Sequence, residues 1–467
     1  MTGANSLELN QIVDGQRLRG ASIVFIVLAA LAMASDGYDL ASLGYIIPEL
    51  LKQWHLGRTA LAPAAGAGII GMAIGGPLLG MLGDRFGRKP MIVAGLATIA
   101  VLDLLMTQVR GPGDLVILRG LVGLMVGGVF PNAAALIAEI TPRLIRGRVL
   151  VLVSLGVVLG IAIPGFVARG LVPTHGWQSI LVVGACAQLV VAAAVALIMP
   201  ESIKYLAART GRELQALRMA RRLRPDLTIA DNARLVAGAA APAKGGSIRL
   251  LFAGSLAVVT PMLWICQAAN QMSNFFSLTW LPQLLQAGGA STAAAGGTAS
   301  LFAIGGLIAG VLLLFVIERL GVMPMVAMFF VGAPLVASMA STSLSPTIHA
   351  LVIVSAGFCV QGIQIGLTAA LGLLYPTTIR SVGTGWTQAA GRLGAFAAPT
   401  VGALLLGLNV STSKLPFAPG ALLLVGGVAC VVLTLACRRQ FGSFRVAEFP
   451  IASGAGKVPL DPVAGTA

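Results

Sequence analysis

The chain has 467 residues, of which 57% are hydrophobic and only 10% are charged, and its mean hydropathy is +0.92. Soluble domains carry about 25% charged residues, so this composition excludes an ordinary soluble protein and indicates a chain folded in a lipid bilayer. The net charge of +15 does not indicate nucleic-acid binding, because the basic residues form short clusters between long apolar runs.

Twelve apolar segments, each close to the length of about 20 residues that a membrane-spanning helix needs, follow one another along the chain. The predicted spans are residues 20–47, 60–82, 90–108, 114–138, 148–171, 178–199, 250–285, 292–317, 322–341, 347–374, 382–407 and 416–437. We therefore expect an all-α membrane protein with twelve transmembrane helices.

The positions of Lys and Arg predict how these spans are oriented. The even-numbered loops and the two termini hold 24 of the 31 basic residues, and basic loops face the cytoplasm. The predicted divisions are a cytoplasmic N-terminal tail (1–19), a six-helix bundle (20–199), a cytoplasmic central loop (200–249), a second six-helix bundle (250–437) and a cytoplasmic C-terminal tail (438–467). The first apolar run is too long for a signal peptide. We expect a multi-pass protein of the bacterial inner membrane.

Two loops of the first half recur in the second half at one offset, 234 residues. An acid-Arg-x-Gly sequence occurs at 84–87 and 318–321, and a Pro-x-x-Ile-Arg sequence occurs at 142–146 and 376–380. Either match alone is ordinary loop chemistry, but the shared offset indicates duplication. It predicts two pseudo-symmetric bundles with a substrate site between them near the midplane.

Two carboxylates stand in the first span, although an ionisable group at the bilayer centre costs at least about 2.5–3.5 kcal/mol. Asp36 and Asp39 are three residues apart and share one face of a helix, and Gly37 leaves room beside them for a ligand or a neighbouring helix. Two carboxylates this close resist simultaneous ionisation, which suits a proton carrier or a substrate site. The alternative is a pair of structural acids bonded to a partner helix, and the sequence does not say which Asp would carry the proton.

Two arginines also lie inside spans. Arg392 is about 15 Å into its span, near the midplane, where a guanidinium can hold a substrate carboxylate bidentately; the alternative is an ion pair with Asp36 or Asp39. Arg119 lies nearer the outer end of its span, where the alternative to a functional role is an interfacial side chain. Asp103, about two-thirds across the third span, has no motif around it and no predicted role.

The loop between the second and third spans predicts a gate. Glu139, at the cytoplasmic end of the fourth span, is expected to pair with Arg85 or Arg88 and to latch the outward-facing state. Asp84 is expected to cap the N-terminus of a facing helix, where an anion is favoured. The predicted gating residues, which would not touch substrate, are Gly83, Asp84, Arg85, Gly87, Arg88, Lys89 and Glu139.

Polar and aromatic side chains within the spans are candidates for lining the cavity. They are Tyr38, Asn270, Asn274, Trp280, Gln361, Gln364, Trp386 and Gln388. Core or interfacial packing is the alternative for each aromatic side chain. The sequence contains no nucleotide-binding loop, metal-ligand cluster or nucleophile–base constellation, so we expect no enzyme, no cofactor and no metal ion. A membrane-bound sensor or enzyme is the least supported class.

Several of these segments resemble known transporter motifs. Residues 83–89, Gly-Asp-Arg-Phe-Gly-Arg-Lys, resemble the signature loop of the major facilitator superfamily, and residues 119–123 and 200–202 resemble other marks of that superfamily. The second-half copy of the loop departs from the pattern, because it continues as Val322-Met323-Pro324 without basic residues.

A narrower resemblance is to the aromatic acid:proton symporter family. Asp36-Gly37-Tyr38-Asp39 resembles its Asp-Gly-x-Asp motif, and residues 280–282, 375–381 and 391–394 also fit that family. The resemblance implies a monomer that takes up an aromatic carboxylate of the benzoate, hydroxybenzoate, protocatechuate or lignin-derived class together with a proton, by alternating access. The partners would be the substrate, the proton and the bilayer, and the proton gradient would be the driving force.

The competing function is a drug or metabolite exporter of the same superfamily, working as a proton antiporter. A stripe of small residues in the fifth span, Gly156, Gly160, Pro164 and Gly165, weakly favours it. The Asp-Gly-Tyr-Asp motif opposes it.

Overall fold

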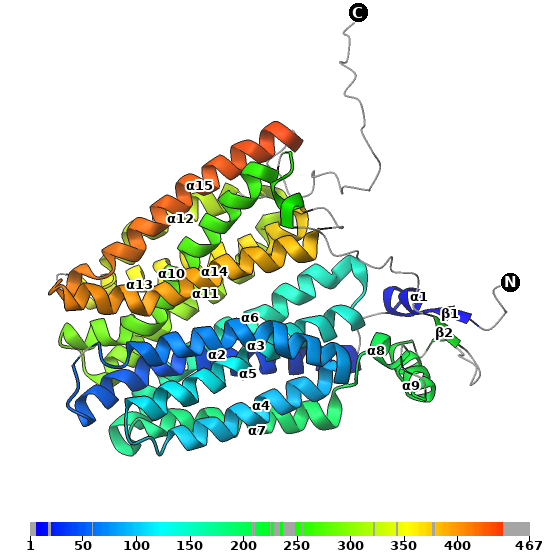
Figure 1. Cartoon of the computed structure of the whole chain (residues 1–467), viewed down its shortest axis with the longest axis horizontal. Coiled ribbons are helices and arrows are strands. Elements are labelled where there is room, and N and C mark those ends of the chain that lie inside the picture. Colours follow the sequence, from blue (N-terminus) through cyan, green and yellow to red (C-terminus); the bar gives the residue numbers. More distant parts are fainter. Residues whose placement is uncertain are drawn as a thin grey trace, which may run out of the picture.

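Helices dominate the fold of this chain (Figure 1). The computed structural model describes residues 6–16, 20–57, 59–207, 209, 211–224, 226–227, 234–236, 248–254, 256–320, 323–341, 344–375 and 379–441. Within these ranges, ten helices are long and apolar enough to cross a membrane. The predicted helical membrane fold is therefore confirmed.

Twelve long helices of the described ranges fall into two groups in Figure 1. The N-terminal bundle contains α2 (Ala21–Gln53), α3 (Ala62–Phe86), α4 (Arg88–Met106), α5 (Pro112–Ile140), α6 (Arg143–His175) and α7 (Gln178–Ile198). The C-terminal bundle contains α10 (Leu256–Ala287), α11 (Thr292–Leu320), α12 (Met323–Ser338), α13 (Pro346–Leu374), α14 (Arg380–Gly407) and α15 (Phe417–Phe441). Each helix overlaps one predicted span.

Two of these helices are not among the ten apolar spans. Helix α12 is apolar but has 16 residues, and α10 has 32 residues but carries polar side chains along its length. The count of twelve membrane crossings therefore stays a prediction.

Small residues bring the helices of each bundle into backbone contact. Gly156 and Gly160 of α6 lie against Ala30 and Ala34 of α2, and a Cβ atom at either glycine would overlap the opposing backbone. Helices in lipid gain little from hydrophobic burial against each other, so close van der Waals packing at small residues holds them together. The small-residue stripe of the fifth predicted span is therefore accounted for by packing between helices.

Hydrogen bonds join the two bundles at the end of the molecule away from the chain termini (Figure 1). Thr292 Oγ1 of α11 donates to Glu49 Oε1 of α2 over 2.8 Å. Ser300 Oγ of α11 donates to the carbonyl oxygen of Ala162 in α6 over 2.7 Å. These contacts hold the two bundles together at that end.

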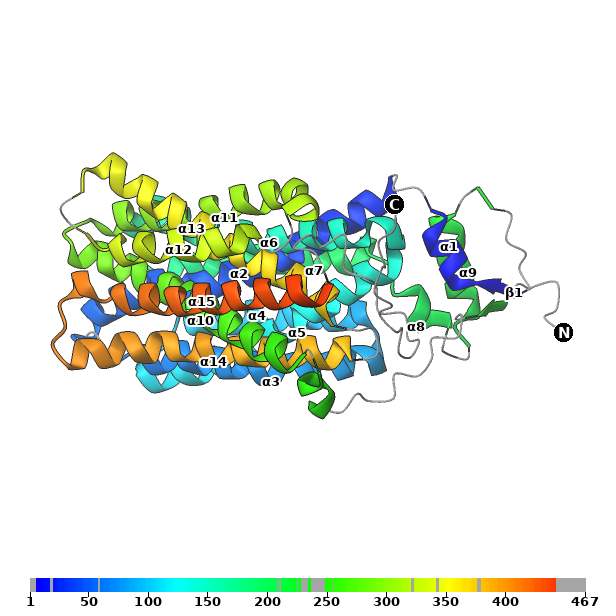
Figure 2. The same ribbon diagram turned by 90° about the horizontal axis from the view of Figure 1, so that it is seen from above.

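A small assembly lies at the opposite end, beside the N-terminus (Figure 2). Strand β1 (Ser6–Glu8) pairs in parallel with β2 (Arg234–Val236), and the short helices are α1 (Leu9–Asp14), α8 (Ile203–Ala207) and α9 (Glu213–Leu223). The apolar side chains of α9 and α1 are buried in the same core. The sequence predicts a polar tail and, in the central loop, a basic helical stretch from Glu201 to Arg224, which contains α8 and α9. The two three-residue strands and α1 are an addition to the all-α prediction. Single turns of 3₁₀ helix occur at Ile248–Phe252 and Thr412–Lys414.

The packing of α6 on α2 predicts a matched pair of glycine variants. We expect Gly156→Leu to lower the thermal unfolding midpoint of the purified protein, because overpacking costs about 1–3 kcal/mol. The control is Gly147→Leu on the same helix, where an added Cβ meets no atom within 4 Å. Tryptophan fluorescence during heating measures both midpoints, and equal losses in the two variants would contradict this account of the packing.

Candidate functional site

A buried ion pair joins α2 to α5. Arg119 Nη1 lies 3.1 Å from Asp39 Oδ1, and Arg119 Nη2 donates to the backbone carbonyl of Asp39 over 3.1 Å. Asp39 is 2% exposed and Arg119 is 5% exposed, so the protein supplies the partners that water would otherwise provide. The alternative of an interfacial Arg119 is therefore wrong, because its guanidinium points into the bundle.

A second pair of charges faces across the boundary between the bundles. Asp36 is as buried as Asp39, and its Oδ1 has no hydrogen-bond partner among the described residues. It interacts electrostatically with Arg392 of α14, which is half-buried. Arg392 Nη1 lies 3.7 Å from the Sδ atom of Met72 in α3, and no described carboxylate lies within 4.0 Å of its guanidinium. In the described part of the chain, the closed ion pair considered for Arg392 is therefore not formed.

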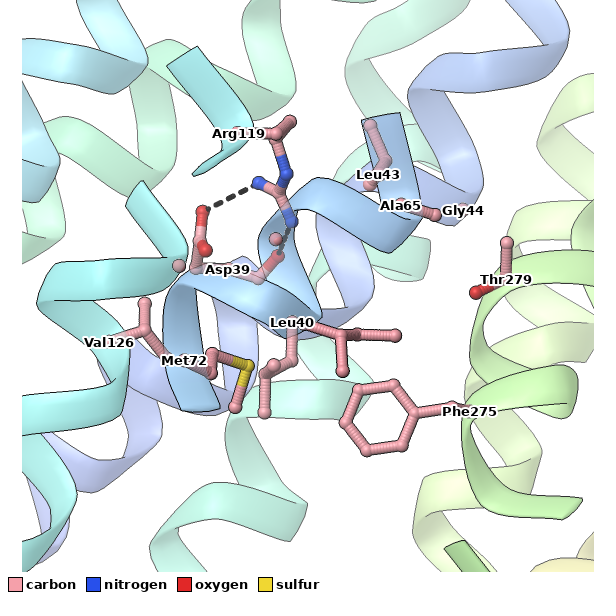
Figure 3. A pocket seen from close by; sticks show the side chains of 13 residues that line it. Asp39, Leu40, Leu43, Gly44, Ala65, Met72, Arg119, Val126, Phe275 and Thr279 are labelled. Carbon is pink, nitrogen blue, oxygen red and sulfur yellow. Dashed lines mark hydrogen bonds and ion pairs between the residues drawn. The ribbon is translucent and has the colours of Figure 1, made fainter. Parts of the chain in front are cut away.

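A small cavity of about 30 Å³ lies beside the Asp39–Arg119 pair. Figure 3 shows the pair on one side and Phe275 and Thr279 of α10 on the other, so both bundles contribute to the wall. The lining residues are Asp39, Leu40, Leu43, Gly44, Ala65, Gly68, Ile69, Met72, Arg119, Gly123, Val126, Phe275 and Thr279. This space holds about one water molecule, whereas sites for small organic ligands typically enclose about 300–1,000 Å³. The cavity has to widen before it can admit an organic ligand.

Amide side chains of the C-terminal bundle bind one another. Four amide–amide hydrogen bonds connect α10 to α13 and α14, namely Asn270 to Gln364 (3.1 Å), Gln361 to Asn274 (3.1 Å), Gln267 to Gln388 (2.9 Å) and Gln267 to Gln364 (3.5 Å). The five predicted amides are thus brought together, and their role in lining a wider cavity stays a prediction. The sequence prediction missed Gln267, although its position three residues before Asn270 places both on one helix face.

The predicted aromatic side chains lie away from the present cavity. Tyr38 points into the N-terminal bundle, where its hydroxyl donates to the carbonyl oxygen of Ile180 over 2.6 Å. Trp280 is buried in the C-terminal bundle, and Trp386 is half-exposed and stacks on Trp264 with ring centroids 6.0 Å apart. The packing alternative therefore fits these three residues. Phe275 and Thr279, from the same helix as Trp280, contribute to the wall instead.

The loop between α3 and α4 is held by an acid from far along the chain. Glu201 Oε1 accepts hydrogen bonds from the backbone N–H groups of Arg88 (3.0 Å) and Lys89 (3.3 Å), so it caps α4. The capping role predicted for Asp84 is wrong, because Asp84 forms an ion pair with Arg88. Gly87, between Asp84 and Arg88 in the chain, has a backbone φ of 110°, a conformation that favours glycine. A Cβ atom at this position would overlap the Glu201 carboxylate.

The predicted pair between Glu139 and Arg88 is present but loose, with 3.9 Å between Oε1 and Nη2. Glu139 also accepts a hydrogen bond from Ser202. The hydroxyl of Tyr205 donates a hydrogen bond to the backbone carbonyl oxygen of Arg85 over 3.3 Å. Glu139 and Arg88 belong to one bundle, so their pair does not itself join the two bundles, and the latching role stays a prediction.

Gly83 lies directly against Asn132 of α5, and a Cβ atom at this position would overlap the Asn132 amide. Asn132 Nδ2 in turn donates to the carbonyl oxygens of Leu79 (3.0 Å) and Gly128 (2.8 Å). Residues 321–322 and 376–378 of the second-half motifs lie outside the described residues.

Two helical bundles with buried charges where they meet define the class of a membrane transporter. The chain belongs to the Major Facilitator Superfamily, whose family model matches residues 29–399. It is therefore a transporter rather than an enzyme.

Relatives across most of the chain agree with this family. The chain is 29% identical to a gallate transporter of Pseudomonas putida and 30% identical to the 4-hydroxybenzoate transporter PcaK of Pseudomonas aeruginosa, in both cases over 86% of this chain and 90% of the relative. These names confirm the predicted resemblance to aromatic acid transporters. A partially occluded, inward-open structure of the xylose transporter XylE from E. coli shares the fold, with a TM-score of 0.65 and 17% identity over 88% of this chain and 98% of that one.

The Asp39–Arg119 pair predicts a strong effect of removing one partner. We expect Arg119→Ala to unfold at a markedly lower temperature, because a buried pair that loses one member typically costs about 3–5 kcal/mol. The double variant Asp39→Asn/Arg119→Gln should recover most of this loss, because it leaves no charge unpaired at the ion pair. Arg110→Ala, at an exposed arginine, is the control. Thermal unfolding of the purified proteins measures all three, and a wild-type midpoint for Arg119→Ala would contradict the pairing.

The Glu201 cap predicts a smaller effect at the cytoplasmic loop. We expect Glu201→Ala to destabilise the protein by about 1 kcal/mol, the typical value of a helix cap. Glu8→Ala, at an exposed glutamate whose side chain has no hydrogen bond or ion pair among the described residues, is the control. The same thermal assay detects the difference, and an unchanged midpoint for Glu201→Ala would argue against capping by this residue.

Proposed function

We propose that this chain imports small aromatic carboxylates together with protons across the bacterial inner membrane, by alternating access and as a monomer. The observation that carries the proposal is the position of Arg392. Its guanidinium lies half-buried at the boundary between the bundles, opposite Asp36, and no described carboxylate lies within ion-pair distance of it. The names of the relatives, which include transporters of gallate, 4-hydroxybenzoate and benzoate, support the substrate class.

Arg392 has the chemistry to bind the carboxylate of such a substrate. A planar guanidinium accepts a carboxylate through two parallel hydrogen bonds, which fixes its orientation as well as its position. Phe275, on the wall of the cavity next to Met72, offers an aromatic face for the substrate ring. The cavity of about 30 Å³ is too small for that ring, so substrate entry requires the bundles to move apart.

Proton uptake follows from the charge that the substrate brings. A carboxylate anion that enters beside Asp36 and Asp39 adds negative charge to a buried region, which is unfavourable unless an acid binds a proton. One proton carried with one anion leaves the charge of the region unchanged. The proton gradient then drives accumulation of the anion, and no cofactor is needed.

The hydrogen bonds between the bundles support an inward-facing arrangement. Thr292–Glu49 and Ser300–Ala162 hold the bundles together at the end away from the termini. The distribution of Lys and Arg predicts that the termini lie in the cytoplasm, and in that orientation this closed end would face outside. Opening it would expose the site to external substrate.

The small residues of α6 no longer favour the alternative function, a drug or metabolite exporter. That alternative rested on these residues, of which Gly156 and Gly160 pack against the backbone of α2. No observation on the described residues now favours export over uptake.

Uptake into proteoliposomes tests the proposal. With a proton gradient directed inward, we expect labelled 4-hydroxybenzoate to accumulate and a protonophore to abolish the accumulation. Arg392→Ala should weaken substrate binding about 10–100-fold, because hydrogen bonds to a charged group contribute about 1.5–3 kcal/mol. Arg392→Lys should restore only part of the affinity, since an ammonium group lacks the planar fork of the guanidinium.

Arg110→Ala is the matched control for the loss of an exposed arginine, and it should transport like the wild type. Uptake of labelled gallate and benzoate in the same assay defines the substrate range. Accumulation that does not respond to the gradient, or that survives Arg392→Ala unchanged, would overturn the proposal.

A further inference from the structure

Asp103 of α4 is a buried acid that none of the motifs explains. It is 1% exposed, and its Oδ1 atom has no hydrogen-bond partner among the described residues. An ionised carboxylate in such a place costs several kcal/mol unless it is paired. Asp103 therefore has to share a counter-charge or bind a proton.

The neighbours of Asp103 come from three other helices. Its carboxyl group lies within hydrogen-bonding reach of the Asp39 carboxyl on α2, and it interacts electrostatically with Arg119 on α5. Tyr38 is the other titratable neighbour from α2, and its hydroxyl donates to the carbonyl oxygen of Ile180. From α7, the side chain of Gln188 lies next to Asp103.

Charge balance sets how many protons this cluster binds. Asp39 and Asp103 bring two carboxyl groups, and Arg119 brings one positive charge. Two carboxyl groups at hydrogen-bonding distance cannot both ionise, and a hydrogen bond between them requires that one carries a proton. With one proton shared by the two acids, the cluster has one negative charge, which Arg119 balances; without that proton, it has one negative charge in excess.

Unpaired polar atoms distinguish the cluster around Asp103 from a hydrogen-bond network that only stabilises the fold. Oδ1 of Asp103 and both polar atoms of the Gln188 amide are buried, and none of them has a hydrogen bond of standard geometry among the described residues, although the Gln188 side chain is close enough to interact with Asp103. Buried polar groups are nearly always paired in a permanent network. The Gln188 amide N–H group can instead donate a hydrogen bond to Asp103 at a stage of the transport cycle when this acid is ionised.

We propose that Asp39 and Asp103 together hold the coupling proton, with Arg119 as their fixed counter-charge and Gln188 as a donor to Asp103 when the proton leaves. This inference rests on the proposed proton coupling and assigns its location. Asp36, which faces Arg392, then lies next to the proposed binding position of the substrate carboxylate. Asp36 and Asp39 are one helical turn apart on α2, so movement of this helix links the proton pair to the substrate position.

Two transport modes separate proton coupling from substrate movement. Counterflow exchanges labelled for unlabelled 4-hydroxybenzoate without net proton movement, whereas accumulation under a pH gradient requires coupling. We expect Asp103→Asn to retain counterflow within about threefold of the wild type and to lose at least about 90% of gradient-driven accumulation, because the amide cannot release a proton. Asp114→Asn, an exposed acid on α5, is the matched control and should behave as the wild type in both modes.

Asp103→Glu keeps a carboxyl group and gives a second readout. We expect this variant to accumulate substrate with a displaced pH profile, which also decides the question if Asp103→Asn does not fold. A coupled wild type with unchanged accumulation in Asp103→Asn would overturn this inference and leave the proposed function standing. Parallel loss of both modes in Asp103→Asn, with a wild-type pH profile in Asp103→Glu, would assign a structural role instead. A wild type that does not accumulate substrate under the gradient would overturn the proposed function itself.

Discussion

Burial of charge in the interior of a membrane protein is the constraint on which this structure depends. Each unpaired ion there costs several kcal/mol, yet the described helices hold Asp36, Asp39 and Asp103 close to only two arginines, Arg119 and Arg392. Arg119 closes one pair with Asp39. Asp36, Asp103 and Arg392 form no such ion pair among the described residues. We propose that during transport a proton binds to an acid and the substrate carboxylate binds to Arg392.

Helix α2 connects this charge arrangement to the fold. It carries Asp36 and Asp39, and glycines on it let neighbouring helices approach from both bundles. Gly37 lies against the backbone of Val157 in α6, and Gly44 lies against the backbone of Leu278 in α10. A shift of one bundle against the other therefore changes the surroundings of both acids directly. In the proposed transport cycle, helix α2 would therefore couple the buried acids to a movement of the bundles without an additional element between them.

The sequence predicted the positions of the helices and of the buried charged residues, because both depend on properties of short segments of the chain. Length and hydropathy located the helices, and the cost of an ion in an apolar segment singled out the buried acids and arginines without knowledge of their partners. The partners themselves depend on packing between distant segments. Asp39 pairs with Arg119 rather than Arg392, and Glu201 caps α4 from 113 residues away. Asp103 had no predicted role until the fold brought it close to Asp39 and Arg119. The strands β1 and β2 were missed because three residues carry too little periodicity to identify a strand.

The number of protons that the protein takes up when the substrate anion binds tests proton coupling at the buried acids. Calorimetric titration of the purified protein with 4-hydroxybenzoate, in buffers of different ionisation enthalpy at one neutral pH, gives this number without any membrane or gradient. We expect uptake of about one proton for each anion bound, because anion binding and protonation are thermodynamically linked. Saturable binding with no proton uptake would contradict proton coupling at these acids.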